Sequence, residues 1–269
     1  MYVFAMLSTD QRIEHWLAQL PPISLDEMSG IKLMNRTDTK FVTNKEKLAS
    51  LLELAQGQYY AQQIDGSRVA NYRTTYWDTL AHRFYLDHHN GRAPRQKIRV
   101  RTYVDSDLTF LEVKTKNNHG RTKKKRITVP SQDKADVVGA GGTAFIQALT
   151  GETFDGIIPT VQNRFQRITL VNFGKTERLT IDFNVGFHNF ETGHDAATGD
   201  LVIIELKRDG NVFSPVLDIL RQLRIHPSGF SKYCIGSLMT NGRLKKNLFK
   251  KKMIRASKLS GADIRPDER

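Results

Sequence analysis

The sequence predicts an α+β protein in which a closed antiparallel β-barrel with a basic interior carries helices packed on its outside. Seven short segments alternate charged and apolar residues with a period of two, as strands with one wet and one packed face do. Their charged faces are mostly basic, so the sheet either spreads these cations over open surface or curls to point them inward at a shared anion. Closure also removes exposed strand edges, and 269 residues suffice for one barrel domain.

The alternating segments define the predicted strands. The clearest is 97–104, where Lys97, Arg99, Arg101 and Tyr103 alternate with Ile98, Val100, Thr102 and Val104. One such strand alone indicates only solvated surface. Seven together favour an inward ring of cations, which would repel itself unless a polyanion lay inside. The other charged faces are Arg36, Asp38 and Lys40; Glu112, Lys114 and Lys116; Lys123 and Lys125; Arg164; Arg178 and Asp182; and Glu205 and Lys207.

Helices flank these strands. One is expected over 8–20, where capping residues precede an apolar stripe and Pro21 ends it, and another over 44–56, capped by Asn44. Both are expected to pack outside the sheet. Further helices are expected over 134–149, interrupted by glycines, and over 215–225.

The last part of the chain is strongly basic. Residues 242–258 carry lysines and arginines around an apolar stripe and predict an amphipathic helix. A docked, solvated last helix is favoured over one that binds a membrane surface or an acidic partner. The residues after Ser260 are expected to be disordered.

The net charge of +13 points to a phosphate polymer, a nucleotide, nucleic acid or an anionic membrane as partner. Few aromatic residues interleave the basic strands, and no base-reading motif occurs, which argues against nucleic acid. No segment has the pattern of a membrane span or a signal peptide. The single cysteine, Cys234, is expected to be a buried hydrophobe. These features predict a cytoplasmic protein.

The histidines do not form a convincing metal site. His82, His88 and His89 precede Asn90-Gly91, a strong turn signal, and are expected to be exposed loop residues rather than zinc ligands. His119 and His194 are expected to be similar.

Six short motifs follow one another along the chain: Arg36-x-Asp38-x-Lys40-Phe41, Tyr72-x-x-x-Tyr76-Trp77-Asp78-Thr79, Lys97-x-Arg99-x-Arg101-x-Tyr103, Glu112-x-Lys114-x-Lys116, Glu205-x-Lys207 and Phe230-Ser231-Lys232-Tyr233. Their ordered set resembles the VTC catalytic domain of the triphosphate tunnel metalloenzymes. The resemblance spans roughly residues 24–240. It divides the chain into an N-terminal helix and linker at 1–23, the tunnel domain at 24–240, and a basic helix and tail at 241–269.

The resemblance implies a tunnel of strands that binds triphosphate or polyphosphate together with a divalent cation, Mn²⁺ or Mg²⁺. It implies catalytic, phosphate-binding cations and a hydroxyl donor at Lys40, Arg99, Arg101, Lys114, Lys125, Arg164, Lys207, Ser231 and Lys232. Arg36, Lys97 and Tyr103 are expected to line the nucleotide site, where Tyr103 either stacks on a base or lines the wall. Lys123 and Arg126 are alternatives to Lys125. Glu205 is implied as the metal ligand; Asp38 and Glu112 either hold a second metal or pair with a neighbouring cation.

The chemistry of these residues suits phosphoryl transfer, which needs phosphate charge neutralised and the reacting oxygens held in line. Family members of the eukaryotic kind resemble ATP-driven polyphosphate polymerases, so the resemblance implies a transferase that uses ATP. Two positions depart from the polymerase pattern: Gln162 replaces a tyrosine two residues before Arg164, and Gly229 replaces a lysine before Phe-Ser-Lys. A triphosphate or polyphosphate hydrolase of the same fold therefore stays an alternative. A noncatalytic polyphosphate-binding module, salt-sensitive but independent of metal, is the third hypothesis.

Overall fold

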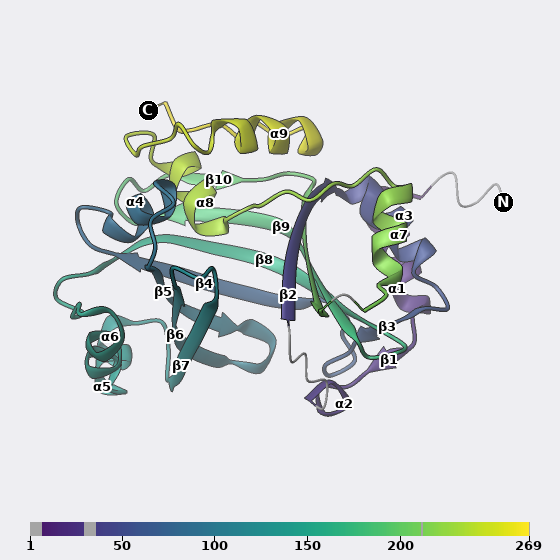
Figure 1. The fold of residues 1–269 in the computed structure, drawn as a ribbon, viewed down its shortest axis with the longest axis horizontal. Helices are drawn as coiled ribbons and strands as arrows, with labels where there is room; N and C mark the ends of the chain where they lie inside the picture. Colours follow the sequence, from purple (N-terminus) through teal and green to yellow (C-terminus); the bar gives the residue numbers. More distant parts are fainter. Residues whose placement is uncertain (1–6, 30–35, 211, 269) are drawn as a thin grey trace.

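The computed structural model describes residues 7–29, 36–210 and 212–268. Its centre is one long, curved antiparallel sheet with helices outside it and at one end of its hollow side (Figure 1). The strand order is β2-β11-β9-β8-β4-β5-β6-β7, while β3 pairs with β8, β10 with β9, and β1 with β3. The strands are β1 (Pro22–Ile23), β2 (Arg36–Asn44), β3 (Tyr59–Gln62), β4 (Ala70–Asp78), β5 (Arg95–Tyr103), β6 (Leu108–Lys116), β7 (Thr122–Val129), β8 (Ile158–Asn172), β9 (Glu177–Asn189), β10 (Asp195–Ala197) and β11 (Leu201–Asp209).

Several helices begin where the sequence predicts. At the start of the first, Ser8 and Gln11 form a capping box, and the Asn44 side chain caps the third by accepting a hydrogen bond from the Lys47 amide. The glycine-interrupted segment forms two short helices rather than one. The helices are α1 (Thr9–Gln19), α2 (Leu25–Ser29), α3 (Lys45–Leu54), α4 (Arg83–His89), α5 (Lys134–Gly139), α6 (Gly142–Thr150), α7 (Pro215–Gln222), α8 (Lys232–Thr240) and α9 (Lys250–Ser260).

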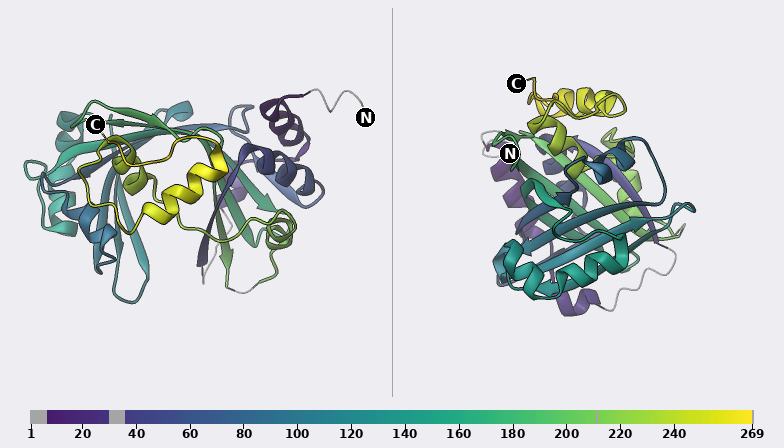
Figure 2. Two further views of the ribbon diagram at one scale, coloured as in Figure 1. Left: turned by 90° about the horizontal axis from the view of Figure 1, so that it is seen from above. Right: turned by 90° about the vertical axis from the view of Figure 1, so that its left-hand side faces the viewer.

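The prediction of a closed barrel is wrong, because the sheet is an open, strongly curved trough (Figure 2). Among the described residues, its two end strands, β2 and β7, are not hydrogen-bonded to each other. Each edge is protected in another way. Residues 227 and 228 bond to the free edge of β2 at Phe41 and Lys40. β7 carries four consecutive cations, from Lys123 to Arg126, and such charges discourage edge pairing.

The three largest apolar clusters of the described residues comprise two outside the trough and one inside it. Outside, α1, α3 and α7 cover aliphatic residues of β8, β9 and β11, and α5 and α6 cover those of β5 and β6. The predicted placement of the first helices on the outer side is therefore confirmed. Inside, α8 and α9 pack on one end of the concave face, and Figure 2 shows α9 lying across that end. The rest of the concave face is left for polar side chains.

Two predictions about the ends and turns are wrong. The residues after Ser260 are packed rather than disordered: Ile264 is fully buried, the Asp267 amide donates to the Leu238 carbonyl, and its carboxylate bonds to His194. His88 and His89 lie in α4 rather than in a hairpin loop, and His89 is buried. An apolar partner, Phe249, packs against both rings, which a local turn signal does not reveal.

Other expectations hold in the described residues. Cys234 is a fully buried free cysteine. None of the described helices has the length and apolar character that crossing a membrane requires.

Candidate anion-binding site

The register of the strands gathers charged side chains on the concave face. Lys97, Arg99 and Arg101 alternate along β5 and face Lys114, Glu112 and Phe110 of β6. At the other side of the trough, Glu205 of β11 lies between Lys40 of β2 and Thr180 of β9. Lys40 acts on the pKa of Lys114 although β2 and β6 are not neighbouring strands. The curvature therefore brings cations from opposite walls toward one another.

On one wall, Arg99, Glu112 and Lys124 form a cluster of ion pairs, the Glu112 cluster. Glu112 Oε2 accepts hydrogen bonds from Arg99 Nε at 2.7 Å and is 2.6 Å from a terminal nitrogen of the same guanidinium. Lys124 Nζ donates to the other carboxylate oxygen at 2.8 Å. Burial raises the pKa of Glu112, but Arg99, Arg101 and Lys124 outweigh burial and hold it at about 2. Glu112 therefore fixes two cations in place, as expected of a carboxylate that pairs.

Arg167 of β8, Asp182 of β9 and Lys232 of α8 form a second group, the Asp182 cluster. Arg167 forks onto both oxygens of Asp182, at 2.6 and 2.8 Å, and Lys232 bonds to the same carboxylate. Burial raises the pKa of Asp182, yet Arg167 and Lys232 hold it well below its usual range. The cluster rests on the stacked rings of Tyr72 and Phe165, whose centroids lie 5.1 Å apart.

The same two rings orient the cations around them. Arg167 lies 4.9 Å above the Tyr72 ring, and Lys232 lies 4.2 Å above the Phe165 ring. Arg101 approaches both rings and donates from Nε to the Thr74 hydroxyl at 3.1 Å. Cation–π contacts of this kind hold a guanidinium without consuming all of its donors.

Other cations of the concave face are held less firmly or not at all. In the described part of the chain, Lys40 and Lys114 make no hydrogen bond or ion pair. Lys97 donates to the Ser231 hydroxyl at 3.1 Å, and Ser231 also caps the N-terminus of α8. Burial, with repulsion from neighbouring cations, lowers the pKa of Lys97, Lys114 and Lys232 to about 8. Buried lysines that lack a full counter-charge are what a bound anion would stabilise.

Glu205 is the carboxylate that this arrangement leaves open to a metal ion. Its contact with Lys207 is long, 3.7 Å, and its side chain is 20% exposed. Burial raises the pKa of Glu205, but Lys40, Lys207 and Lys114 outweigh it and hold it at about 2, so it is ionised. The Thr180 hydroxyl, directly opposite on β9, is buried without a hydrogen-bond partner in the described structure.

A magnesium or manganese ion fits this site when it arrives together with phosphate. Within the described residues, no group of three or more histidine, cysteine or acidic side chains could hold a metal on its own. Mg²⁺ ordinarily keeps several waters and uses one or two carboxylates together with substrate phosphates. Glu205 can supply the carboxylate, and the orphaned Thr180 hydroxyl can bond to a water or a phosphate oxygen. A bare cation would be repelled by Lys40 and Lys207.

Most of the residues singled out from the sequence lie on the concave strand face or at its α8 end. Tyr103 packs 5.0 Å from Tyr72 and so lines the wall. Asp38 lies opposite Lys207. For Arg36, the position on β2 opposite Asp209 is described, but its side chain lies outside the described residues. The residues brought together are Lys40, Lys97, Arg99, Arg101, Glu112, Lys114, Glu205, Lys207, Ser231 and Lys232.

Two candidates point the other way. Lys125 pairs with Val113, a core residue under α5 and α6, so it belongs to the outer side of the sheet, while Lys124 and Arg126 pair with Lys114 and Glu112. Arg164 pairs with Arg73 on the outer side, is exposed, and donates to Gln162 at 3.3 Å.

Arg167 takes the inner position that Arg164 lacks. β8 pairs with β4 without a break from Arg164 to Arg167, so these two residues, three positions apart, lie on opposite faces of the strand. The alternation of Phe165 and Arg167 with Ile168 was the sequence signal for this position. The residue two places before Arg167 is Phe165, an aromatic ring that lacks the hydroxyl of the expected tyrosine.

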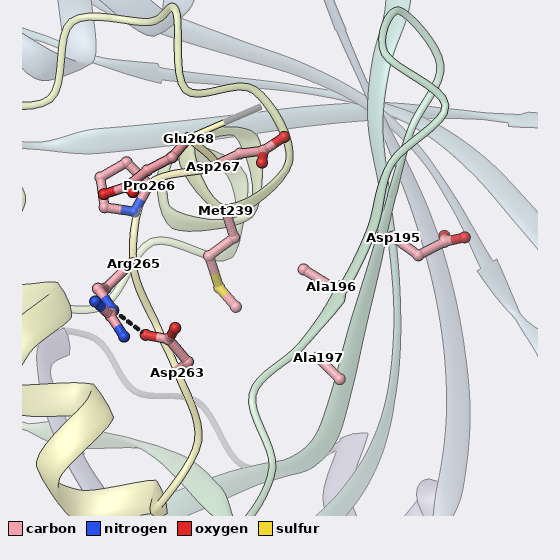
Figure 3. Close-up of a pocket in the computed structure, with 9 residues that line it drawn as sticks. All are labelled: Asp195, Ala196, Ala197, Met239, Asp263, Arg265, Pro266, Asp267 and Glu268. Carbon is pink, nitrogen blue, oxygen red and sulfur yellow. Dashed lines mark hydrogen bonds and ion pairs between the residues drawn. The ribbon is translucent and has the colours of Figure 1, made fainter.

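A separate cavity of about 480 Å³ lies between β10 and the C-terminal tail (Figure 3). It is lined by Asp195, Asp263, Asp267 and Glu268, with Arg265 paired to Asp263. Its negative charge is opposite to what a phosphate ligand requires. The basic trough, not this cavity, is therefore the candidate site.

The structure is thus that of an α+β protein whose curved sheet gathers arginines, lysines and the carboxylate of Glu205 on its concave face, a candidate anion site. The model of the VTC domain family matches residues 35–241, and the chain belongs to that family. No curated protein matches the chain.

Similar solved structures include a protein from Hippeastrum described as an adenylyl cyclase with a dominant triphosphatase activity. It is 14% identical, with a TM-score of 0.49, covering 75% of this chain and 94% of its own. A candidate adenylate cyclase from Bacillus halodurans is 14% identical, with a TM-score of 0.47, covering 74% and 96%. Another, from Vibrio parahaemolyticus, is 9% identical, with a TM-score of 0.43, covering 75% and 97%.

Proposed function

We propose that this protein carries out metal-dependent phosphoryl transfer on its concave face and synthesises polyphosphate from ATP. Membership of the VTC domain family supports phosphate chemistry. The observation that carries the proposal is the pair Lys40, beside Glu205 on the adjacent strand, and Lys114, on the opposite wall, whose ammonium groups have no hydrogen-bonded or ion-paired partner in the described structure. A cationic site of this kind is stabilised by a polyanion rather than by the protein itself.

The length of the cation row supports a chain of phosphates as ligand. Arg95, Lys97, Arg99 and Arg101 share one face of β5. Six residues of strand separate the first from the last, about 20 Å at the usual rise per residue. This row is longer than one triphosphate, so it can hold ATP phosphates and an acceptor chain end to end.

The residues divide the work of the transfer. Arg99 and Arg167, each fixed by a buried carboxylate, present remaining donors to phosphate oxygens without having to reorganise. Lys40, Lys114 and Lys232 neutralise charge as point cations. A terminal oxygen of the acceptor chain forms a bond to the γ-phosphorus as the bond to ADP breaks, and positioning supplies most of the acceleration. Glu205 would hold a divalent ion, which would supply Lewis-acid stabilisation of the phosphate charge.

Incubation of the purified protein with ATP and MnCl₂, then with ATP and MgCl₂, tests the proposal. Free phosphate is assayed in each sample, and polyphosphate is resolved on a gel. A ladder that grows with time supports the polymerase. Phosphate release without a ladder indicates the hydrolase of the same fold, and intact ATP with salt-sensitive polyphosphate binding indicates the noncatalytic module.

Affinity for long-chain polyphosphate should fall as the pH rises above about 8. In the free protein the pKa of Lys97, Lys114 and Lys232 is about 8, below the usual value, so these lysines are charged below that pH and lose their protons above it. A bound polyanion raises these pKa values, so binding above pH 8 requires proton uptake. At pH 9 the Kd should be about tenfold weaker for each lysine that must be recharged.

Calorimetric titration from pH 7 to pH 9.5 measures this dependence. Internal phosphates of a long chain stay ionised throughout, so the ligand contributes little. Lys114→Ala should bind more weakly at pH 7 but lose part of the pH dependence. An affinity that stays flat across this range would contradict the assignment of these lysines to the site.

A further inference from the structure

Helix α9 brings a lysine to the end of the concave face that α8 covers. The Lys252 ammonium lies beside Gly229, 3.7 Å from the position that a β-carbon on Gly229 would occupy. Gly229 precedes Ser231, the residue that receives the Lys97 ammonium. Two lysines distant in sequence thus reach the same short loop, one from β5 and one from α9.

Lys252 is held at this point by packing rather than by a counter-charge. Its ammonium lies 5.8 Å from the centre of the Phe249 ring, and in the described structure it has no hydrogen bond or ion pair. Met253 and Ala256 of α9 are buried, which fixes the helix on the trough. Lys252 itself is exposed, so a ligand can reach it from solvent.

Several cations act on His88 at the α9 end of the concave face. Burial lowers the pKa of His88 to about 2, with Lys97, Arg95, Lys252 and Lys40 adding to the effect. Those cations come from β5, α9 and β2. His88 stacks on Phe249, and its Nδ1 is buried without a partner in the described structure. A neutral histidine surrounded by cations leaves their charge uncompensated.

We propose that Lys252 binds phosphate at the α9 end of the concave face and holds the part of a polyphosphate chain that extends beyond Lys97. The proposal rests on the proposed function and deepens it. It continues the row that starts at Arg101 by one cation supplied from outside the sheet. A ligand no longer than a triphosphate fits between Arg101 and Lys97, so Lys252 acts on long chains and not on short ones.

The expected result concerns chain length and salt. In calorimetry with long-chain polyphosphate, Lys252→Ala should weaken binding roughly fivefold, as for an exposed ion pair. The slope of log affinity against log salt should fall by about one, because one phosphate contact is lost. Binding of tripolyphosphate should not change. Lys251→Ala, exposed on the same helix and about 100° around its axis, serves as the matched control.

Moving the lysine charge from position 252 to Gly229 tests whether a cation is needed at this point of the loop. Gly229 has room for a side chain, since the nearest atom to an added β-carbon is the Lys252 ammonium at ordinary contact distance. Lys252→Ala combined with Gly229→Lys should therefore regain long-chain affinity and the original salt slope.

Three outcomes overturn the inference. In the first, Lys252→Ala binds long-chain polyphosphate as tightly as Lys251→Ala does. In the second, Lys252→Ala weakens the binding of long chains and of tripolyphosphate equally and leaves the salt slope unchanged, which indicates a structural effect. Failure of the double variant to regain affinity would place the contact elsewhere. If the wild-type protein binds neither tripolyphosphate nor long chains, the proposed function fails as well, which distinguishes that result from the three outcomes above.

Discussion

Glu205→Gln should abolish turnover while polyphosphate binding stays intact or becomes tighter. The substitution keeps the shape of the side chain but removes a carboxylate that, unlike Glu112 and Asp182, makes no close ion pair with an arginine in the described structure; its contact with Lys207 is 3.7 Å. Loss of a metal ligand should lower kcat at least 100-fold, since even the groups that orient such ligands are worth 10- to 100-fold. Lys40, Lys114 and Lys207 then face the ligand without a neighbouring negative charge, which favours polyanion binding.

Two measurements on the same variant check this expectation: initial rates with ATP over a range of MnCl₂ concentrations, and the Kd for long-chain polyphosphate without metal. Glu53→Gln, the same change at an exposed position of α3, is the control and should match the wild type in both. An unchanged rate in the Glu205→Gln variant would show that Glu205 does not bind the metal ion. A parallel loss of rate and binding would make Glu205 a structural residue.

The period-two alternation carried most of the correct predictions about the sheet. It placed Arg99 and Glu112 on one face because each strand's side chains alternate strictly. It could not predict closure, because hydrogen bonding between β2 and β7 depends on how far the whole sheet curls. Some of the cations that led to the prediction of an inward ring lie on the edge strand β7, where their charge opposes hydrogen bonding to another strand.

The errors at the site have similarly local causes. In β7, four cations stand in a row, so no alternation shows whether Lys124 or Lys125 points inward. In β8, Arg164 and Arg167 lie three residues apart and so on opposite faces, and the alternation alone does not show which of the two faces is concave. Short motifs also say nothing about the contribution of α9, since Lys252 reaches Gly229 only through tertiary packing.

The two clusters on the concave face share one design. Each consists of a buried carboxylate with an arginine and a lysine bonded to it: Glu112 with Arg99 and Lys124, and Asp182 with Arg167 and Lys232. The carboxylates fix the cations before a ligand arrives, so binding requires little reorganisation. The net charge of each cluster stays positive, and the lysines left outside both clusters add to it.

Arg167→Ala should cost both stability and function, whereas Arg164→Ala should cost neither. Removal of Arg167 leaves the buried Asp182 with Lys232 alone, and breaking such a pair destabilises proteins by roughly 3–5 kcal/mol, here toward the lower end because one cation remains. It also removes donors aimed into the trough, so long-chain affinity and turnover should fall by about 100-fold or more. Arg164 is exposed on the outer side, where substitutions usually stay within about 0.5 kcal/mol.

Urea unfolding, together with rates and Kd values, separates the two effects. If Arg167→Ala does not fold, Arg167→Lys serves in its place: it keeps a charge beside Asp182 and most of the stability, but a lysine cannot form the fork that holds the guanidinium over Tyr72. The Arg167→Lys variant should therefore keep a low rate, while its unfolding midpoint in urea returns toward that of the wild type. Equal losses in Arg164→Ala and Arg167→Ala would show that the face of β8 on which an arginine lies does not decide which one meets the phosphate.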